Sequence, residues 1–345
     1  MTNLRLPAEW ELQDAIQIAF PSKHSDWQNY WEEVIPCYVN IIKMIASYQP
    51  LIIVGDDKNE VEYYLSDLEK TNIHVIELPI NDTWARDHGA ITVQHGENYL
   101  IYDFVFNGWG LKFAADKDNL ITGELWNKGI YHAKEKIHPG LVLEGGSIES
   151  DGKGVLLTTT NCLLSPNRNP HLSKEQIEQQ LIKLFGLKKV FWLEHGHLIG
   201  DDTDAHIDTV ARFCDERTIA YVQCTDRDEV HYMDLKKMEE ELQALRTLDG
   251  EPYILVPLPM AEVIFAPDDN RRLPATYANF LIMNEVVLLP TYNITQDELA
   301  LSQLQTAFPN KKVVGVDCKA LLLQHGSLHC ITMQYPKGSI EWKNL

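Results

Sequence analysis

The order of apolar and polar positions divides the chain into units in which two apolar runs flank a short polar turn. The runs have the length of strands, and pairs such as His95-Gly96 and Asp151-Gly152 stand where a hairpin would reverse direction. The pattern therefore predicts β-hairpins. Five segments show it: "WARDHGAITVQHGENYLIYDF" from Trp84, "EGGSIESDGKGVLLTTT" from Glu144, "HIDTVARFCDERTIAYVQC" from His206, "YANFLIMNEVVLLPTY" from Tyr277 and "HGSLHCITMQYPKGSIEW" from His325.

Helical patterns follow the second, third and fourth of these hairpins. In "LSKEQIEQQLIKLFG", Ser173 and Gln176 have the spacing of a capping box, and Gly186 ends the apolar pattern. "DLKKMEEELQALRT" follows the third hairpin. "TQDELALSQLQTAF" follows the fourth and predicts a second capping box at Thr295 and Glu298. Each unit is therefore expected to be a hairpin followed by a helical connector.

The hairpins begin about 50 to 70 residues apart, which is the period of a repeat architecture. No proline-rich or glycine/serine-rich linker separates them. A unit that returns in this way is typical of a closed α/β domain with radial repeats, so residues 1–345 are expected to form a single domain. Two ordinary α+β domains are the alternative that the pattern leaves open.

Composition narrows the class of protein. Acidic residues outnumber basic ones 50 to 30, so the formal charge of −20 disfavours nucleic acid and anionic membranes and favours cationic ligands. No apolar run reaches the roughly 18 residues of a membrane helix, and the start lacks a signal-peptide pattern. The cysteines form no CxxC pair, which favours reduced thiols in a cytoplasmic protein. They are Cys37, Cys162, Cys214, Cys224, Cys318 and Cys330.

Polar residues recur at one position of the units, just ahead of the first strand. If the units surround an axis, these residues meet at its centre and form a site of carboxylates, one imidazole and one thiol. In a strand, residues two apart face the same side, so His206 and Asp208 are predicted to point together and His329 away from Cys330. The residues at this position are Asp87, Glu144, His206, Asp208 and Cys330.

Each of these residues also has a structural explanation. A lone cysteine is more often buried packing than a nucleophile, Arg86 and Asp87 can form a structural ion pair, and "EGGS" can be a simple turn. A Mn²⁺ or Zn²⁺ site is a further alternative, because "EHGHLIGDDTDAHID" brings imidazoles and carboxylates close in sequence. That reading leaves Cys330 without a role. Its ligands would come from His195, His197, Asp201, Asp202, Asp204, His206 and Asp208.

Six ordered motifs resemble the agmatine deiminases and their bacterial peptidylarginine-deiminase relatives. The likeness runs from residue 6 to residue 336. It implies a five-bladed, pseudo-symmetric α/β propeller, and an activity that needs no metal or organic cofactor. The motifs are "WARDHGAI", "LEGGSIESDG", "NRNPH", "AHIDTVARF", "PATYANFLIMN" and "HGSLHCITMQ".

The resemblance assigns roles to the residues already selected. Cys330 matches the nucleophile, and His206 matches the general acid and base. Asp87 and Asp208 match the two carboxylates that hold the guanidinium group. Glu144 matches the carboxylate that orients the histidine.

Two further residues are assigned to the substrate channel by the resemblance. Trp84 would line the channel, and Asp202 would face the distal amine of the substrate. The chain departs from the usual family pattern before the nucleophile. Three glycines and Asn-Ile-His usually precede the cysteine, whereas this chain has His325-Gly326-Ser327-Leu328-His329. The reaction type is therefore better defined than the substrate.

The resemblance implies hydrolysis of agmatine to N-carbamoylputrescine and ammonia through a covalent cysteine intermediate, as a step towards putrescine and polyamines. Peptidyl-arginine or free arginine are alternative substrates, and the acidic run at 201–204 favours a distal ammonium group over the carboxylate of free arginine. Amidino transfer, a metal-dependent guanidine hydrolase and a non-catalytic propeller remain alternatives. No nucleic-acid or membrane partner is expected, and a homo-oligomer stays open.

Overall fold

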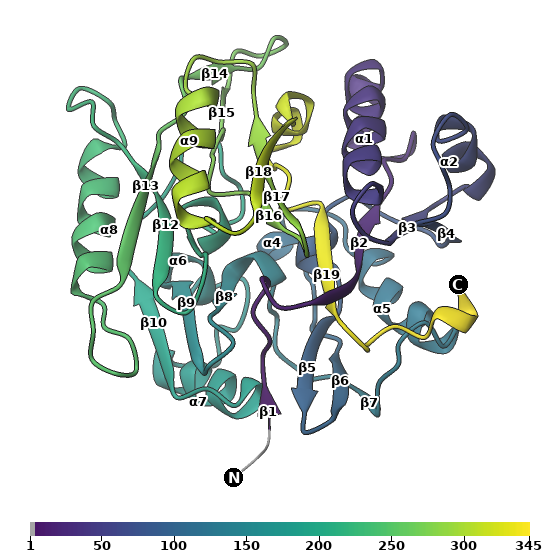
Figure 1. Ribbon diagram of the computed structural model, residues 1–345, viewed down its shortest axis with the longest axis horizontal. Coiled ribbons are helices and arrows are strands. Elements are labelled where there is room, and N and C mark those ends of the chain that lie inside the picture. The colour runs from purple at the N-terminus through teal and green to yellow at the C-terminus, as the bar shows by residue number, and fades with distance from the viewer. Residues whose placement is uncertain (1–3) are drawn as a thin grey trace.

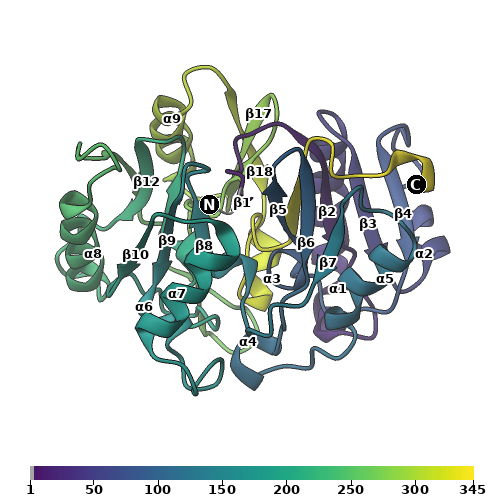
Figure 2. The ribbon, with the colours of Figure 1, turned by 90° about the horizontal axis from the view of Figure 1, so that it is seen from below.

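The strands form small separate sheets, and the longer helices lie around their outside (Figures 1 and 2). A computed structural model describes residues 4–345 of the chain; residues 1–3 of the predicted domain lie outside it. Five of the sheets share one connectivity. In each, an antiparallel pair of strands is followed by a helix and then by a strand parallel to the second strand of the pair.

Three of these sheets arise from hairpins predicted at Trp84, Glu144 and His206. The turns at His95-Gly96 and Asp151-Gly152 separate the paired strands as predicted. We call each such sheet together with its helices a unit. The first unit contains β1 (Leu4–Arg5), β5 (Ile91–His95), β6 (Asn98–Tyr102), α4 (Gly108–Leu111), α5 (Asp118–Asn127) and β7 (Glu135–Ile137). The second unit contains η2 (Gly145–Ser147), β8 (Ile148–Ser150), β9 (Val155–Thr159), α6 (Thr160–Leu163), α7 (Lys174–Phe185) and β10 (Lys189–Leu193). The third unit contains η3 (Ile207–Thr209), β11 (Ala211–Phe213), β12 (Thr218–Gln223), α8 (Tyr232–Ala244) and β13 (Ile254–Pro259).

The fourth hairpin, at Tyr277, is also present, and a short hairpin precedes it. The preceding pair is β14 (Ile264–Phe265) and β15 (Arg272–Leu273). The fourth unit contains β16 (Leu281–Ile282), β17 (Val286–Thr291), α9 (Asp297–Ala307), β18 (Lys312–Asp317) and η4 (Lys319–Gln324).

The fifth predicted hairpin, at His325, is wrong. Its first strand, β19 (Thr332–Pro336), pairs with β2 (Gln13–Ala19) from the other end of the chain, with Gln334 opposite Ile16. The two strands lie side by side in Figure 1. The segment after β19 turns away, because the Asp14 carboxylate accepts hydrogen bonds from the amides of Gly338 and Ile340. The two ends of the chain therefore build one unit together.

The remaining elements complete this fifth unit and lead to the first. They are η1 (Asp26–Tyr30), α1 (Trp31–Ala46), β3 (Leu51–Gly55), α2 (Lys58–Tyr64), β4 (Ile73–Glu77), α3 (Ala85–His88) and η5 (Trp342–Asn344). Strand β3 runs parallel to both β2 and β4. None of the helices within residues 4–345 combines the length and apolar character that crossing a bilayer requires.

One of the two predicted capping boxes is confirmed. At α7 the Ser173 side chain accepts from the Gln176 amide and the Gln176 side chain accepts from the Ser173 amide, and the helix ends at Gly186 in the left-handed conformation. The box predicted at Thr295 and Glu298 is wrong, because α9 starts at Asp297 without a side-chain cap. The Asp297 carboxylate folds back onto the preceding turn.

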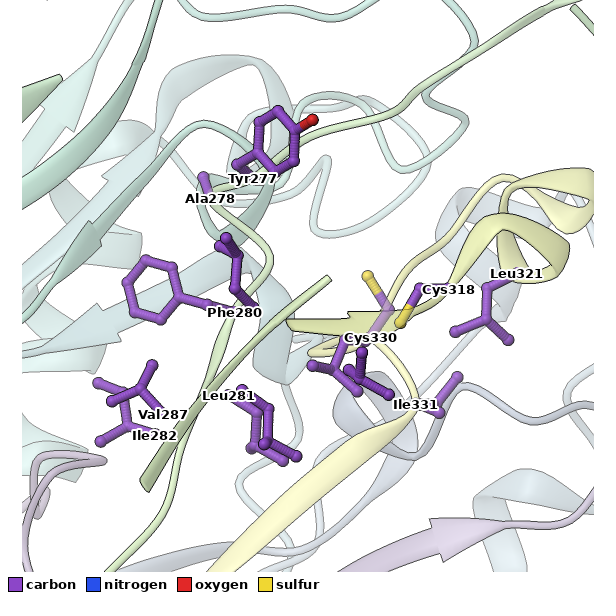
Figure 3. Packing of buried hydrophobic residues seen from close by; sticks show 14 of the residues in the cluster. Tyr277, Ala278, Phe280, Leu281, Ile282, Val287, Cys318, Leu321, Cys330 and Ile331 are labelled. Carbon is purple, nitrogen blue, oxygen red and sulfur yellow. The ribbon is translucent and has the colours of Figure 1, made fainter. Parts of the chain in front are cut away.

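The apolar core lies between the sheets and the outer helices. Phe280 and Leu281, at the start of the fourth unit, belong to the same buried cluster as Cys330 and Ile331, which precede β19 (Figure 3). Close packing holds core side chains in rotamer minima and leaves few voids around them. The turn that carries Cys330 is therefore anchored by the core.

The joining of the two chain ends through β2 makes a stability prediction. Ile16 is fully buried in β2, so Ile16→Ala leaves a cavity and should lower the free energy of unfolding by about 3 kcal/mol. Urea unfolding of Leu12→Ala is the control, since Leu12 is 60% exposed and its loss should cost less than about 0.5 kcal/mol. Equal effects of the two substitutions would contradict this placement of β2.

Candidate active site

The candidate site residues lie in short helical turns just before the first strand of each unit. Asp87 lies in α3, Glu144 precedes η2, and His206 and Asp208 flank Ile207 in the turn at η3. The strand expected at His206 is therefore wrong. The prediction that His206 and Asp208 point towards one place still holds, because the tight turn brings both side chains to the same point.

That meeting point is marked by Gly146, on the second unit. A methyl group added to its Cα would lie 2.7 Å from Nδ1 of His206, 2.8 Å from Oδ1 of Asp87 and 3.1 Å from Oδ2 of Asp208. The Gly146 amide also donates to Oδ1 of Asp87, at 3.0 Å. Three ionisable side chains from two units thus converge where a third unit offers only backbone.

Asp87 is buried and its two oxygens have separate donors. Trp109 Nε1 donates to Oδ2 at 2.8 Å, and the Gly146 amide donates to Oδ1. Burial raises the pKa of Asp87 to about 6; the positive charge of His206 opposes the rise, and the charge of Asp208 adds to it. Burial therefore destabilises the ionised carboxylate of Asp87, and a bound cation would reduce that cost.

The imidazole of His206 is buried beside negative groups. Burial would lower the pKa of His206, but the charges of Asp87 and Glu144 and the neighbouring Cys162 side chain outweigh it, so the pKa lies well above its ordinary value. Nδ1 lies 3.6 Å from Oδ1 of Asp87. Nε2 has no hydrogen-bond partner among the described residues. His206 is thus a protonated imidazole with a free N–H.

Asp208 presents one free oxygen. Its Oδ2 lies 2.7 Å from Nδ1 of His329, whereas Oδ1 is buried and has no hydrogen-bond partner among the described residues. Burial would raise the pKa of Asp208, yet the hydrogen bond and charge of His329 lower it below the ordinary value. A guanidinium N–H would satisfy the free oxygen.

Glu144 is placed beside His206 but bonds to another residue. Both of its oxygens accept from Nε of Arg168, at 2.8 and 3.0 Å. A Glu144 oxygen, the Cys162 sulfur and a His206 ring nitrogen lie within 4.8 Å of one another. Glu144 therefore acts on the imidazole by charge and close approach, while Arg168 holds Glu144 in place.

Cys330 is buried at the end of its turn and contacts Asn279, a residue that the sequence reasoning missed. Oδ1 of Asn279 lies 3.3 Å from the Cys330 sulfur and accepts from the amides of His329 and Cys330. Its Nδ2 donates to the backbone oxygen of Asp208. Asn279 stands just before the first strand of the fourth unit, so the position shared by the other site residues was the signal that could have identified it.

The surroundings of Cys330 favour its thiol form. Burial raises the pKa of Cys330 well above its ordinary value, and the negative charges of Asp208 and Asp87 raise it further. A cation placed between these two carboxylates would reduce both effects and favour the thiolate.

One pocket reaches part of this group of residues. Cys330, Asp87, Trp84 and Asp202 lie in its wall. The neighbouring Asp201 has its oxygens occupied by Thr203 and the amide of Ala205, whereas burial raises the pKa of Asp202. Asp202 is thus the carboxylate of this run that is available to a ligand.

The metal site considered from sequence is not assembled by the span 194–208. His195 contacts Glu241, and Asp204 contacts Lys112 and Arg168. Within residues 4–345, two groups bring three ligand atoms within 4.8 Å, and of this span only His206 belongs to either. They are Glu144–Cys162–His206 and Glu9–Glu149–His329.

The pocket wall holds a buried thiol and one carboxylate, and a second carboxylate and a buried imidazole lie close to that carboxylate. These are groups with which an enzyme could act on a cationic substrate through a cysteine. The chain belongs to the family of Porphyromonas-type peptidyl-arginine deiminases, whose model matches residues 5–336. These are hydrolases of C–N bonds in amidines.

Solved structures and curated relatives agree with this assignment. A Campylobacter jejuni agmatine deiminase, solved with substrate bound and a serine in place of one cysteine, is 38% identical, covers 97% of each chain and has a TM-score of 0.90. A Porphyromonas gingivalis protein named "Putative Arginine Deiminase" is 48% identical, covers 98% of this chain and 100% of its own, and has a TM-score of 0.93. A Legionella pneumophila protein named "Putative agmatine deiminase" is 32% identical over 96% of this chain and 95% of its own.

The crowding around Gly146 makes a prediction. Gly146→Ala would push apart His206, Asp87 and Asp208, and a displacement of about 1 Å is enough to lower kcat/KM about 100-fold. Steady-state kinetics measures this. Gly123→Ala in α5 is the control, because its methyl group would meet only the flexible ends of Lys136 and Asp103, and its kcat/KM should be unchanged. A fully active Gly146→Ala variant would contradict the convergence.

Proposed function

We propose that the protein is an agmatine deiminase, which hydrolyses agmatine to N-carbamoylputrescine and ammonia and so supplies the synthesis of putrescine and other polyamines. The observation that carries the proposal is the convergence of His206, Asp87 and Asp208 at Gly146, with Asp87 also lying in the wall of one pocket together with Cys330 and Asp202. The names of the relatives support the same substrate.

The two carboxylates select the planar cation. A guanidinium group presents parallel N–H pairs, and Asp208 offers a free oxygen to one side while Asp87 offers its remaining lone pairs to the other. Trp84 lines the pocket beside the apolar stem of the substrate. These contacts hold the guanidinium carbon next to the sulfur of Cys330.

The reaction then proceeds in two halves. The bound cation favours ionisation of Cys330, whose proton passes to solvent, and the thiolate attacks the guanidinium carbon. His206 gives its proton to the departing nitrogen, and ammonia leaves. The neutral imidazole next takes a proton from water, and the resulting hydroxide hydrolyses the covalent thiouronium intermediate. The charge of Glu144, held by Arg168, supports the protonated form of His206 in each cycle.

Asp202 favours a substrate with a distal ammonium group. Lys112, a cation beside Asp202, donates to Asp204 and to the backbone oxygen of Asp202, so it is not free for the carboxylate of arginine. Peptidyl-arginine deimination is the second candidate, supported by the description of the family. Assay of ammonia and of the carbamoyl product with agmatine, free arginine and an arginine peptide separates the three.

We further propose that the five sheets are blades of a propeller around the site and that residues 1–345 form one domain. Their shared connectivity and the contribution of side chains from every unit to the site support this. The absence of nucleic-acid or membrane partners is proposed on the formal charge of −20, and a cytoplasmic location on the scattered cysteines. A homo-oligomer remains open.

The nucleophile makes the first functional prediction. Cys330→Ala should reduce kcat for agmatine by at least about 10⁴-fold, because no other group can form the covalent intermediate, while agmatine still binds with similar affinity. Calorimetric titration measures the binding. Cys318→Ala, another fully buried cysteine outside the site, is the control and should retain turnover. Turnover by Cys330→Ala would disprove the assignment.

Asp87 makes a prediction about pH. The free protein has a pKa of about 6 at Asp87, so below about pH 6 the carboxylate becomes neutral and kcat/KM should fall tenfold per pH unit. Because this pKa is raised above 3.8, ionisation of Asp87 disfavours folding above pH 6, and the penalty disappears as the pH falls towards 3.8. Asp87→Asn should therefore lose activity without a lower Tm at pH 7.5. A kcat/KM that stays constant down to pH 5 would contradict the role.

A further inference from the structure

His329, directly before the nucleophile, lies between two buried carboxylates. Its Nδ1 is 2.7 Å from Oδ2 of Asp208, and its Nε2 is 2.7 Å from Oε2 of Glu9. The ring is 1% exposed, and its backbone amide donates to Asn279. The histidine therefore links the substrate-binding carboxylate to the N-terminal segment of the chain.

The two carboxylate contacts of His329 determine which of its ring nitrogens carry a proton. An ionised carboxylate only accepts, and a neutral imidazole has one donor nitrogen and one acceptor nitrogen. A neutral His329 would place a lone pair against a carboxylate oxygen at 2.7 Å on one side. Both contacts are favourable when both ring nitrogens carry a proton, which makes the ring an imidazolium.

Glu9 is held rigidly enough to anchor this ring. Its Oε2 also accepts from Nη2 of Arg212 at 2.7 Å, and its Oε1 accepts from the Ile282 amide at 2.7 Å. The other charged groups around the ring are Arg86, 3.7 Å from Glu9, and Glu149, which pairs with Arg212. Three acids and three bases thus balance one another behind the site, counting Asp208 and His329.

The contact between His329 and Asp208 fixes the orientation in which the Asp208 carboxylate faces a substrate. With Oδ2 bound to His329, the carboxylate cannot rotate freely, and its unpartnered Oδ1 is left for a guanidinium N–H. The positive ring also favours the ionised form of Asp208 before any substrate arrives. Asp87 has His206 at 3.6 Å from its Oδ1, but burial still raises its pKa, so Asp87 is the weaker acid of the two.

We infer that His329 is a positioning residue of the reaction: an imidazolium anchored by Glu9 that keeps Asp208 ionised and turns its free oxygen towards the guanidinium group. This inference rests on the proposed function, since it assigns the guanidinium to Asp208. It also gives a role to Glu9, the first glutamate of "LPAEWE", which lies far from the other site residues in sequence.

Kinetics of His329→Gln and Glu9→Gln tests the inference. Glutamine at 329 keeps one donor but loses the charge, so KM for agmatine should rise about 10- to 100-fold with a smaller change in kcat. Asp208 then ionises less readily, so a second protonation should steepen the acid limb of kcat/KM at a pH below the pKa of Asp87. Glu9→Gln should cause the same changes to a lesser degree. His195→Gln, which breaks the His195–Glu241 contact far from the pocket, is the matched control and should change neither quantity.

Binding of the guanidinium ion itself separates this inference from the choice of substrate. If wild-type protein does not turn over agmatine, the proposed function fails, but calorimetric titration with guanidinium chloride in the Cys330→Ala background still compares His329 with Gln. A weaker guanidinium affinity in His329→Gln supports the inference. Unchanged affinity and an unchanged pH profile in a variant with a native-like Tm would overturn it.

A measurement on the wild-type protein covers the case in which the variants fail to fold. With ¹⁵N-labelled histidine, the ring nitrogens of an imidazolium have similar chemical shifts, whereas those of a neutral ring differ widely. We expect both His329 nitrogens to show the protonated value at pH 7.5. A neutral-tautomer pattern at that pH would overturn the inference.

Discussion

The structure depends on keeping two carboxylates, Asp87 and Asp208, close together out of water in the absence of their cation. Burying a charge is costly unless a partner compensates it, and two like charges add to that cost. The charges of the two carboxylates are compensated in different ways. Asp208 contacts His329 at 2.7 Å, whereas Asp87 receives two neutral donors and lies 3.6 Å from the His206 ring, and burial still raises the pKa of Asp87. A cationic substrate would supply the compensation that Asp87 lacks.

The same electrostatic balance controls the nucleophile. The carboxylates that attract the substrate also oppose ionisation of Cys330, so the free protein holds a buried thiol rather than an exposed reactive thiolate. A cation between the carboxylates removes the opposition at the moment when the thiolate has something to attack. Specificity for a cation and protection of the thiol would therefore follow from one arrangement of charges.

The sequence allowed four hairpins, three helices and the principal site residues to be predicted, because each follows from local patterns or from ordered motifs. His206 and Asp208 were paired by assuming a strand; the chain instead makes a short 3₁₀ turn, and the pairing survived because both geometries bring the residues together. The pairing of β19 with β2, the anchor at Glu9 and the hydrogen bonds of Asn279 could not be predicted. Each joins residues more than 50 positions apart, and no local periodicity encodes such contacts.

The departure from the family pattern before Cys330 can be understood in steric terms. His325 adopts a φ of 69°, a conformation that favours glycine, and its Nδ1 contacts the backbone oxygen of Gly200, which offsets part of the strain. Gly326 is retained because a methyl group there would lie 2.1 Å from the ring of Trp84. One glycine beside Trp84 is thus kept, and His325, where the usual pattern has another glycine, lies in the pocket wall that also contains Asp202. Under the proposed function, the change would alter the part of the pocket that meets the distal end of a substrate and leave the groups proposed to react with its guanidinium end in place.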